Sequence, residues 1–248
     1  MAGHSKWANI QHRKKAQDAK RGKLFTRLIR EITIAARLGD ANPDSNPRLR
    51  LAMDKAIAAN MPKDSITRAI KRGSGEIEGA VYENISYEGY GPGGVAILIE
   101  CTTDNKNRSV SDVRHAFTRF GGNLGTSGSV AYLFKQCGVL SYPADADEDA
   151  ILEAATSAGA EDIESEDNIE ILIKPESLLQ LKQAMTDAGF APNSVEIEMR
   201  PTNLVPLNDD DSDKLLRLLE ALEDCDDVQN VYCNASFADS ALNQAAAQ

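Results

Sequence analysis

The chain has 248 residues, and its 38 acidic residues outnumber its 27 basic ones, giving a formal net charge of −11. This average argues against a polyanionic partner, and no apolar run approaches the roughly 20 residues that span a bilayer. The charge is unevenly divided, because residues 1–75 hold 17 Lys and Arg against 6 Asp and Glu, whereas residues 76–248 hold 10 against 32. Since polyanion binding depends on local charge, we expect nucleic acid to contact the first 75 residues.

Residues 1–23 are the most basic part of the chain and have almost no apolar periodicity. We expect a flexible arm, because so few apolar side chains cannot offset the entropy lost on ordering. The only Trp, Trp7, lies among these cations and could stack on an unpaired base. A solvated basic tail without a function is the competing interpretation. The predicted nucleic-acid contacts are Lys6, Trp7, Arg13, Lys14, Lys15, Lys20, Arg21, Lys23, Arg27 and Arg30.

Residues 24–79 are predicted to form a helical domain. Apolar side chains recur at helical spacing over residues 25–36, 49–57 and 66–70, with turn-rich breaks between them. We expect Arg27, Arg30 and Arg37 on the outer side of the first helix, where they extend the positive surface. A helix-turn-helix over residues 49–72 and a plain helical bundle both fit this pattern.

Residues 80–136 change to mixed strand and helix. Residues 81–87 and 95–101 are strand-like, and the glycine-rich residues 89–94 are predicted to join them as a hairpin. A phosphate-binding loop is disfavoured there, because a strand follows and the Lys-Ser/Thr pair is absent. A helix over residues 107–120 and a short strand over 130–134 are expected next.

The order of elements in residues 137–204 is strand, helix, strand, strand, helix, strand, which is typical of a ferredoxin-like domain. A helix over residues 209–223 and a strand over 228–232 follow, and these two cannot form a domain alone. The sequence therefore predicts an α+β, multidomain protein with an N-terminal helical domain and two α+β domains. The ferredoxin-like domain is inserted into the middle domain, which comprises residues 80–136 plus 205–236, and residues 237–248 form a flexible tail.

Little in the sequence favours catalysis. The three histidines, His4, His12 and His115, have no ligand partners at metal-binding spacing, so we expect no metal and no cofactor. The four cysteines form no CxxC pair and are expected to be reduced structural thiols of a cytoplasmic protein. Cys225 lies among carboxylates, which should raise the thiol pKa. We therefore expect the protein not to be an enzyme.

Long strings in this chain closely resemble the YebC/PmpR family. They are MAGHSKWANIQHRKKAQDAKRGKLFTRLIREI, NPRLRLAMDKAIAANMPKDSITRAIKRG, YEGYGPGGVAILIECTTDNKNRSVSDVRHAFTRFGGNLGTSGSVAYLF and LEDCDDVQNVY. The resemblance spans nearly the whole chain, although residues 140–210 match more by pattern than by string. It implies the same three-domain layout, no enzymatic activity and no cofactor. The start of the family sequence at Met1 leads us to expect no transit peptide and a bacterial cytoplasmic location.

Two functions remain open after this resemblance. Members of the family are described as DNA-binding transcriptional regulators, whereas related proteins, including the mitochondrial translational activator of cytochrome c oxidase subunit I, act in translation. A DNA-binding regulator would bind the phosphates of duplex DNA with its basic end. A translation factor would insert the arm into ribosomal RNA and relieve stalled ribosomes, for example on proline runs. The acidic part could dock the ribosome or another basic protein partner. We expect no membrane partner.

Overall fold

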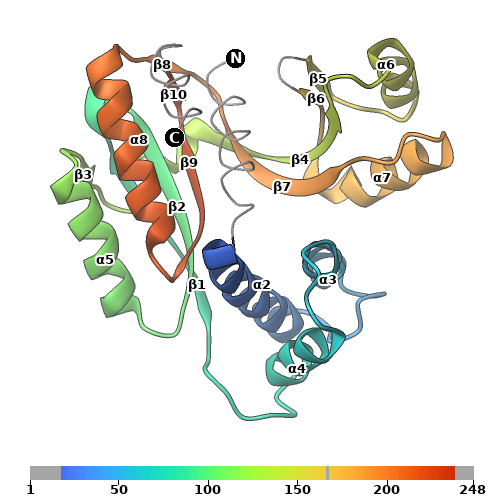
Figure 1. Cartoon of the computed structure of the whole chain (residues 1–248), viewed down its shortest axis with the longest axis horizontal. Helices are drawn as coiled ribbons and strands as arrows, with labels where there is room; N and C mark the ends of the chain where they lie inside the picture. Colours follow the sequence, from blue (N-terminus) through green and yellow to red (C-terminus); the bar gives the residue numbers. More distant parts are fainter. Residues whose placement is uncertain (1–17, 166–167, 238–248) are drawn as a thin grey trace.

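The computed structural model describes residues 18–165 and 168–237, and these form three bodies (Figure 1). An N-terminal group of helices lies below a central sheet that carries two helices, and a second sheet with its own helices lies to one side. This arrangement confirms the predicted α+β, multidomain fold class. Within the described residues, no helix is both long enough and apolar enough to cross a bilayer.

The N-terminal body consists of α2 (Asp18–Leu38), α3 (Pro47–Ala58) and α4 (Lys63–Gly73). Pro47 occupies the first turn of α3, and the side chain of Asn46 accepts a hydrogen bond from the backbone N–H of Leu49, which fixes where that helix begins. The three helices bury a common core that includes Ile32 and Ile66. Because α2 begins at Asp18, residues 18–23 are helical and the predicted boundary of the arm is wrong by six residues.

The central sheet contains β1 (Glu83–Tyr90), β2 (Ala96–Thr103), β3 (Asn123–Leu124) and β9 (Val228–Cys233). Its strand order is β3-β1-β2-β9, so a strand from the far end of the chain pairs with β2. The helices α5 (Lys106–Arg119) and α8 (Asp209–Asp224) pack against this sheet and close the largest core, around Ile97, Phe117 and Leu219. Two further short strands, β8 (Val205–Pro206) and β10 (Ala235–Ser236), pair with each other.

The inserted body contains β4 (Phe134–Pro143), α6 (Glu148–Ser157), β5 (Asp162–Ser165), β6 (Asn168–Ile173), α7 (Leu178–Asp187) and β7 (Ser194–Pro201). Its antiparallel sheet has the order β5-β6-β4-β7, which is the strand arrangement of the predicted ferredoxin-like domain. The two helices bury Ile151, Leu181 and Met185 against one face of the sheet. The chain therefore leaves the central body through β4 and returns after β7.

Three local predictions need correction. The expected strand over residues 130–134 is a 3-10 turn, Ala131–Leu133, and β4 begins only at Phe134. The glycine-rich hairpin connection is shorter than expected, because β1 continues to Tyr90 and Pro92–Gly94 forms a second 3-10 turn. Phe237, assigned to the flexible tail, is 6% exposed and packs in the central core, while the rest of that tail lies outside the described residues.

Candidate nucleic-acid interface

Most of the residues predicted to contact nucleic acid lie at the very start of the chain. Lys6, Trp7, Arg13, Lys14 and Lys15 fall outside the described residues. The backbone of residues 20 and 21 belongs to α2, but the side chains of Lys20 and Arg21 also fall outside the described part. The contribution of this arm to binding therefore stays a prediction.

The structure places Lys23, Arg27 and Arg30 against the C-terminal end of α8. The ammonium of Lys23 lies 2.9 Å from the carboxylate of Asp224. Arg27 donates a hydrogen bond to the backbone carbonyl of Glu223, and Arg30 donates one to the carbonyl of Asp226. Cations at a helix C-terminus are stabilised by the partial negative charge of its free carbonyls. The expected outer position is therefore wrong for Arg27 and Arg30, whereas Arg37 is exposed to solvent as expected.

A buried carboxylate explains why Arg30 turns inward. Asp227 is 3% exposed, and the guanidinium of Arg30 lies 3.2 Å from it. Arg108 from α5 donates to both Asp227 oxygens at 2.8 and 2.9 Å. Thr103 and Ser109 donate their hydroxyls to the same carboxylate at 3.0 and 2.8 Å. This cluster attaches the N-terminal helices to the central body, and no local pattern in the sequence indicates it.

The outward basic surface of the N-terminal helices lies mainly on α4. Ile66 and Ala69 are buried against α2, and Gly73 allows a close approach, since a Cβ there would lie 2.3 Å from the carbonyl oxygen of Thr33. The opposite side of α4 is exposed to solvent. We call the exposed cations on this helix and beside its C-terminal end the α4 basic face: Arg37, Lys63, Arg68 and Lys71.

The connection between α3 and α4 is short enough for a helix-turn-helix. Four residues, 59–62, separate the two helices, and Asn60 has a φ of 57°, the only positive φ of a non-glycine residue in the described part of the chain. Asn tolerates this left-handed conformation better than most residues. Met61 follows and is 5% exposed, so the turn is anchored in the same core as Ala56 and Ile66. The turn thus holds α4 with its basic face outward.

The cysteines of the structure are free thiols in unreactive settings. Burial, with smaller contributions from Asp112, Asp224 and Asp226, raises the pKa of Cys225 to about 11. The direction predicted from the surrounding carboxylates is confirmed, although burial is the larger cause. Burial likewise raises the pKa of Cys101 to about 12. Among residues 18–165 and 168–237, no group of three or more His, Cys, Asp or Glu side chains is arranged to hold a metal ion.

Comparisons with known proteins identify the family. Residues 5–76 match the family description "TACO1/YebC protein N-terminal domain", and residues 82–235 match "TACO1/YebC second and third domain". The chain is 60% identical over 244 residues to "Probable transcriptional regulatory protein Tgr7_2237" of Thioalkalivibrio sulfidiphilus, with 98% of each chain covered. It is 56% identical over 246 residues to "Probable transcriptional regulatory protein PMI1113" of Proteus mirabilis, again with 98% coverage of both.

A solved structure gives the same result at the level of the fold. The crystal structure titled as a conserved hypothetical protein, Aq1575, from Aquifex aeolicus superposes with a TM-score of 0.84 at 46% sequence identity. The match covers 90% of this chain and 93% of the other. With two family descriptions that together account for most of its length, and relatives that align over nearly all of it, this chain belongs to the TACO1/YebC family.

Proposed function

We propose that this protein is a non-enzymatic, DNA-binding regulator of gene expression that contacts nucleic acid through its first 75 residues. The α4 basic face carries this proposal, because it presents several exposed cations on a molecule that is otherwise acidic. Residues 76–248 contain 32 Asp and Glu against 10 Lys and Arg, so phosphates are repelled by the central and inserted bodies. Binding is thereby restricted to one end of the molecule.

The geometry of α3 and α4 favours duplex DNA. In a helix-turn-helix, the second helix enters the major groove while the first crosses the backbone. The anchored turn at Asn60 and Met61 holds α4 in place, and Lys63, Arg68 and Lys71 are free of the α8 contacts that occupy Arg27 and Arg30. Cations of this kind position a protein on phosphates and do not by themselves read a sequence.

The names of the relatives support a regulatory role. Proteins aligned over nearly the whole chain are described as probable transcriptional regulatory proteins. The four free thiols suit a reducing compartment, and we place the protein in the cytoplasm. The raised pKa of Cys225 and Cys101 makes both poor nucleophiles, which supports a role without catalysis.

The test is a triple charge reversal on α4, Lys63→Glu/Arg68→Glu/Lys71→Glu, measured by fluorescence anisotropy on a mixed-sequence DNA duplex at several salt concentrations. Each lost phosphate contact should flatten the slope of log K against log salt by about 0.9. Affinity at low salt should fall by about tenfold or more. The matched control reverses three exposed cations on the other bodies, Arg114→Glu/Lys174→Glu/Lys214→Glu, and should have a smaller effect. Equal losses in the two variants would refute the assignment to α4.

Ribosomal RNA is the second candidate partner, and Trp7 among the cations of the arm favours it. Stacking on unpaired bases suits irregular RNA better than an intact duplex. A translation factor of this kind would relieve stalls on difficult sequences such as proline runs. Co-sedimentation with ribosomes at two salt concentrations, comparing the intact protein with the α4 variant and an arm variant, separates the two roles. Loss of ribosome binding only in the arm variant, with DNA binding intact, would favour translation.

A further inference from the structure

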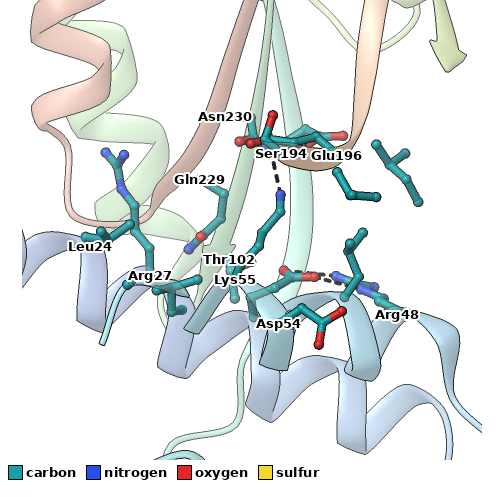
Figure 2. Close-up of a pocket in the computed structure, with 18 of the residues that line it drawn as sticks. Leu24, Arg27, Arg48, Asp54, Lys55, Thr102, Ser194, Glu196, Gln229 and Asn230 are labelled. Atoms are coloured by element: carbon teal, nitrogen blue, oxygen red, sulfur yellow. Dashed lines mark hydrogen bonds and ion pairs between the residues drawn. The ribbon is translucent and has the colours of Figure 1, made fainter. Parts of the chain in front are cut away.

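The three bodies surround a cleft with a volume of about 1400 Å³. One wall comes from α2 and α3, a second from the central sheet and α8, and a third from α7 and β7. Figure 2 shows Arg48, Asp54 and Lys55 on the helical side, with Ser194 and Glu196 of β7 across from them. Junctions between domains are preferred places for ligand sites.

The size of this cleft indicates the kind of ligand. Sites for drug-sized molecules occupy roughly 300–1000 Å³, so the cleft is larger than a small molecule or a single cofactor requires. An α-helix with its side chains is about 10–12 Å in diameter, which makes a segment of polypeptide a suitable occupant.

The charges lining the cleft exclude a polyanion. Nine acidic and six basic side chains line its described surface. Four of the basic groups are neutralised by acidic neighbours: Lys23 by Asp224, Arg48 by Glu31, Lys55 by Glu196 and Lys182 by Asp54. A fifth, Arg27, is bonded to the Glu223 carbonyl. Asp213 and Glu220 are exposed on one side of α8, two turns apart, with the sixth basic side chain, the exposed Arg217, between them. Glu176 is exposed beside α7, so acidic groups remain in excess.

Two apolar side chains in the cleft lie outside the hydrophobic cores of the described residues. Leu51 of α3 and Leu179 of α7 are half-buried and line the cleft from different bodies. Neither belongs to a hydrophobic cluster formed by the described residues, in contrast to Leu49 and Leu178 beside them. Apolar side chains that stay partly exposed after folding are removed from water when a ligand covers them, and this burial favours binding.

From these features we infer that the cleft is a docking site for a cationic, amphipathic segment of a protein partner. Leu51 and Leu179 contact its apolar face, and the carboxylates of Asp213, Glu220 and Glu176 attract its cations. The acidic side chains that exclude nucleic acid from this cleft are the ones that favour a basic polypeptide. The site is separate from the α4 basic face, so one molecule can hold nucleic acid and a basic protein together.

Two ion pairs join the helical and inserted bodies across the cleft. Lys55 lies 3.3 Å from Glu196, and Lys182 lies 2.9 Å from Asp54. All four side chains are partly exposed to solvent, so each pair contributes little stability and is screened by salt. The two bodies can therefore separate to admit a segment without a large loss of stability.

The test uses the full chain and three labelled peptides of about 18 residues, or about five helical turns. One is an amphipathic Leu/Lys helix, the second replaces Lys with Glu, and the third replaces Leu with Ser. The wild-type protein should bind the Leu/Lys peptide and neither of the others. Leu51→Gln/Leu179→Gln should weaken binding about tenfold or more at all salt concentrations. Asp213→Asn/Glu220→Gln should weaken it about three- to tenfold at low salt and less at high salt.

Matched controls lie on α6 and just before it, outside the cleft. Leu152→Gln changes an exposed leucine, and Asp145→Asn/Glu153→Gln removes two exposed carboxylates. Both should bind the peptide like the wild type. Because the charge variants alter only exposed side chains, they test the cleft even where the double leucine variant fails to fold.

Several results would overturn the inference. These are an absence of binding to the Leu/Lys peptide, equal binding by cleft and control variants, and a loss of single-stranded RNA binding in the cleft variants without a loss of peptide binding. The α4 charge-reversal variant should retain peptide binding. Failure of the cleft proposal is thus distinguishable from failure of the DNA-binding proposal, which is measured on duplex DNA.

Discussion

The guanidinium of Arg30 in α2 lies 3.2 Å from the carboxylate of Asp227, in the loop between α8 and β9. Arg30 is 11% exposed in its side chain and Asp227 is 3% exposed, so this ion pair is largely removed from water. It joins the N-terminal helices to the central body. A buried charge that loses its partner is costly, because desolvation is no longer offset by attraction.

Replacing Asp227 by Asn should therefore destabilise the protein. The variant keeps the size of the side chain but leaves Arg30 with an uncompensated charge, and the expected loss in the free energy of unfolding is about 3 kcal/mol. Denaturant unfolding followed by circular dichroism measures it. Asp226→Asn is the control, because that side chain is exposed and only its backbone carbonyl contacts Arg30. Similar stability of the two variants would contradict a structural role for the buried pair.

A second buried carboxylate, Glu88 of β1, holds the loop before β4. Its oxygens accept hydrogen bonds from the backbone N–H groups of Gly128, Val130 and Ala131 at 2.7 to 2.8 Å, and the residue is 5% exposed. Glu88→Gln replaces one acceptor oxygen with a donor, which leaves buried N–H groups without a partner. The expected cost is about 2 kcal/mol. Hydrogen exchange should accelerate at those three amides, whereas Glu153→Gln should leave their exchange unchanged.

Glu198 should make the free energy of unfolding depend on pH. Burial raises the pKa of Glu198 to about 7, and the nearby Glu196 and Glu170 add to the shift while Arg200 and Lys55 oppose it. The folded protein then binds a proton that the unfolded chain, with its ordinary pKa of 4.5, has released. The stability that comes from a protonated Glu198 in the folded protein is fully present below pH 4.5. It is lost as the pH rises through 7, where the buried side chain becomes charged.

Glu198→Gln should remove this part of the pH dependence. Unfolding measured at intervals from pH 5 to pH 8 should show a smaller decline for the variant than for the wild type. At pH 8 the variant should be the more stable of the two, because it no longer buries a charge. An unchanged decline in the variant would assign the pH dependence to other groups.

The role of Trp7 is tested by comparing Trp7→Ala with Lys14→Glu/Lys15→Glu. If Trp7 stacks on an unpaired base, its loss should cost about 1–3 kcal/mol on single-stranded or structured RNA, with little dependence on salt. Duplex DNA should hardly be affected. The lysine changes should weaken binding to both nucleic acids and lose much of their effect at high salt. A lower melting temperature of Trp7→Ala with unchanged RNA affinity would make Trp7 a structural residue.

The order of elements was accessible from the sequence alone. The strand-helix-strand-strand-helix-strand pattern after residue 137 predicts the β5-β6-β4-β7 sheet, because hydrophobic periodicity is a local property that survives in the fold. The leftover helix and strand at the C-terminus predict a return to the sheet that begins at residue 81, since they cannot form a domain alone. The structure adds that this strand, β9, pairs with β2. The uneven distribution of charge along the chain can likewise be read from the sequence without a structure.

The tertiary structure decided which cations face solvent. Arg30 and the Asp226 carbonyl that it contacts are 196 residues apart, and their proximity depends on how the helical body docks on the central one. No periodicity along α2 distinguishes the inward Arg30 from the exposed Arg37, because both lie on a basic helix. The cleft has the same origin, since its walls come from three bodies whose separate sequences carry no signal of their shared surface. Local patterns determine elements, whereas docking of the domains determines which side chains remain available for binding.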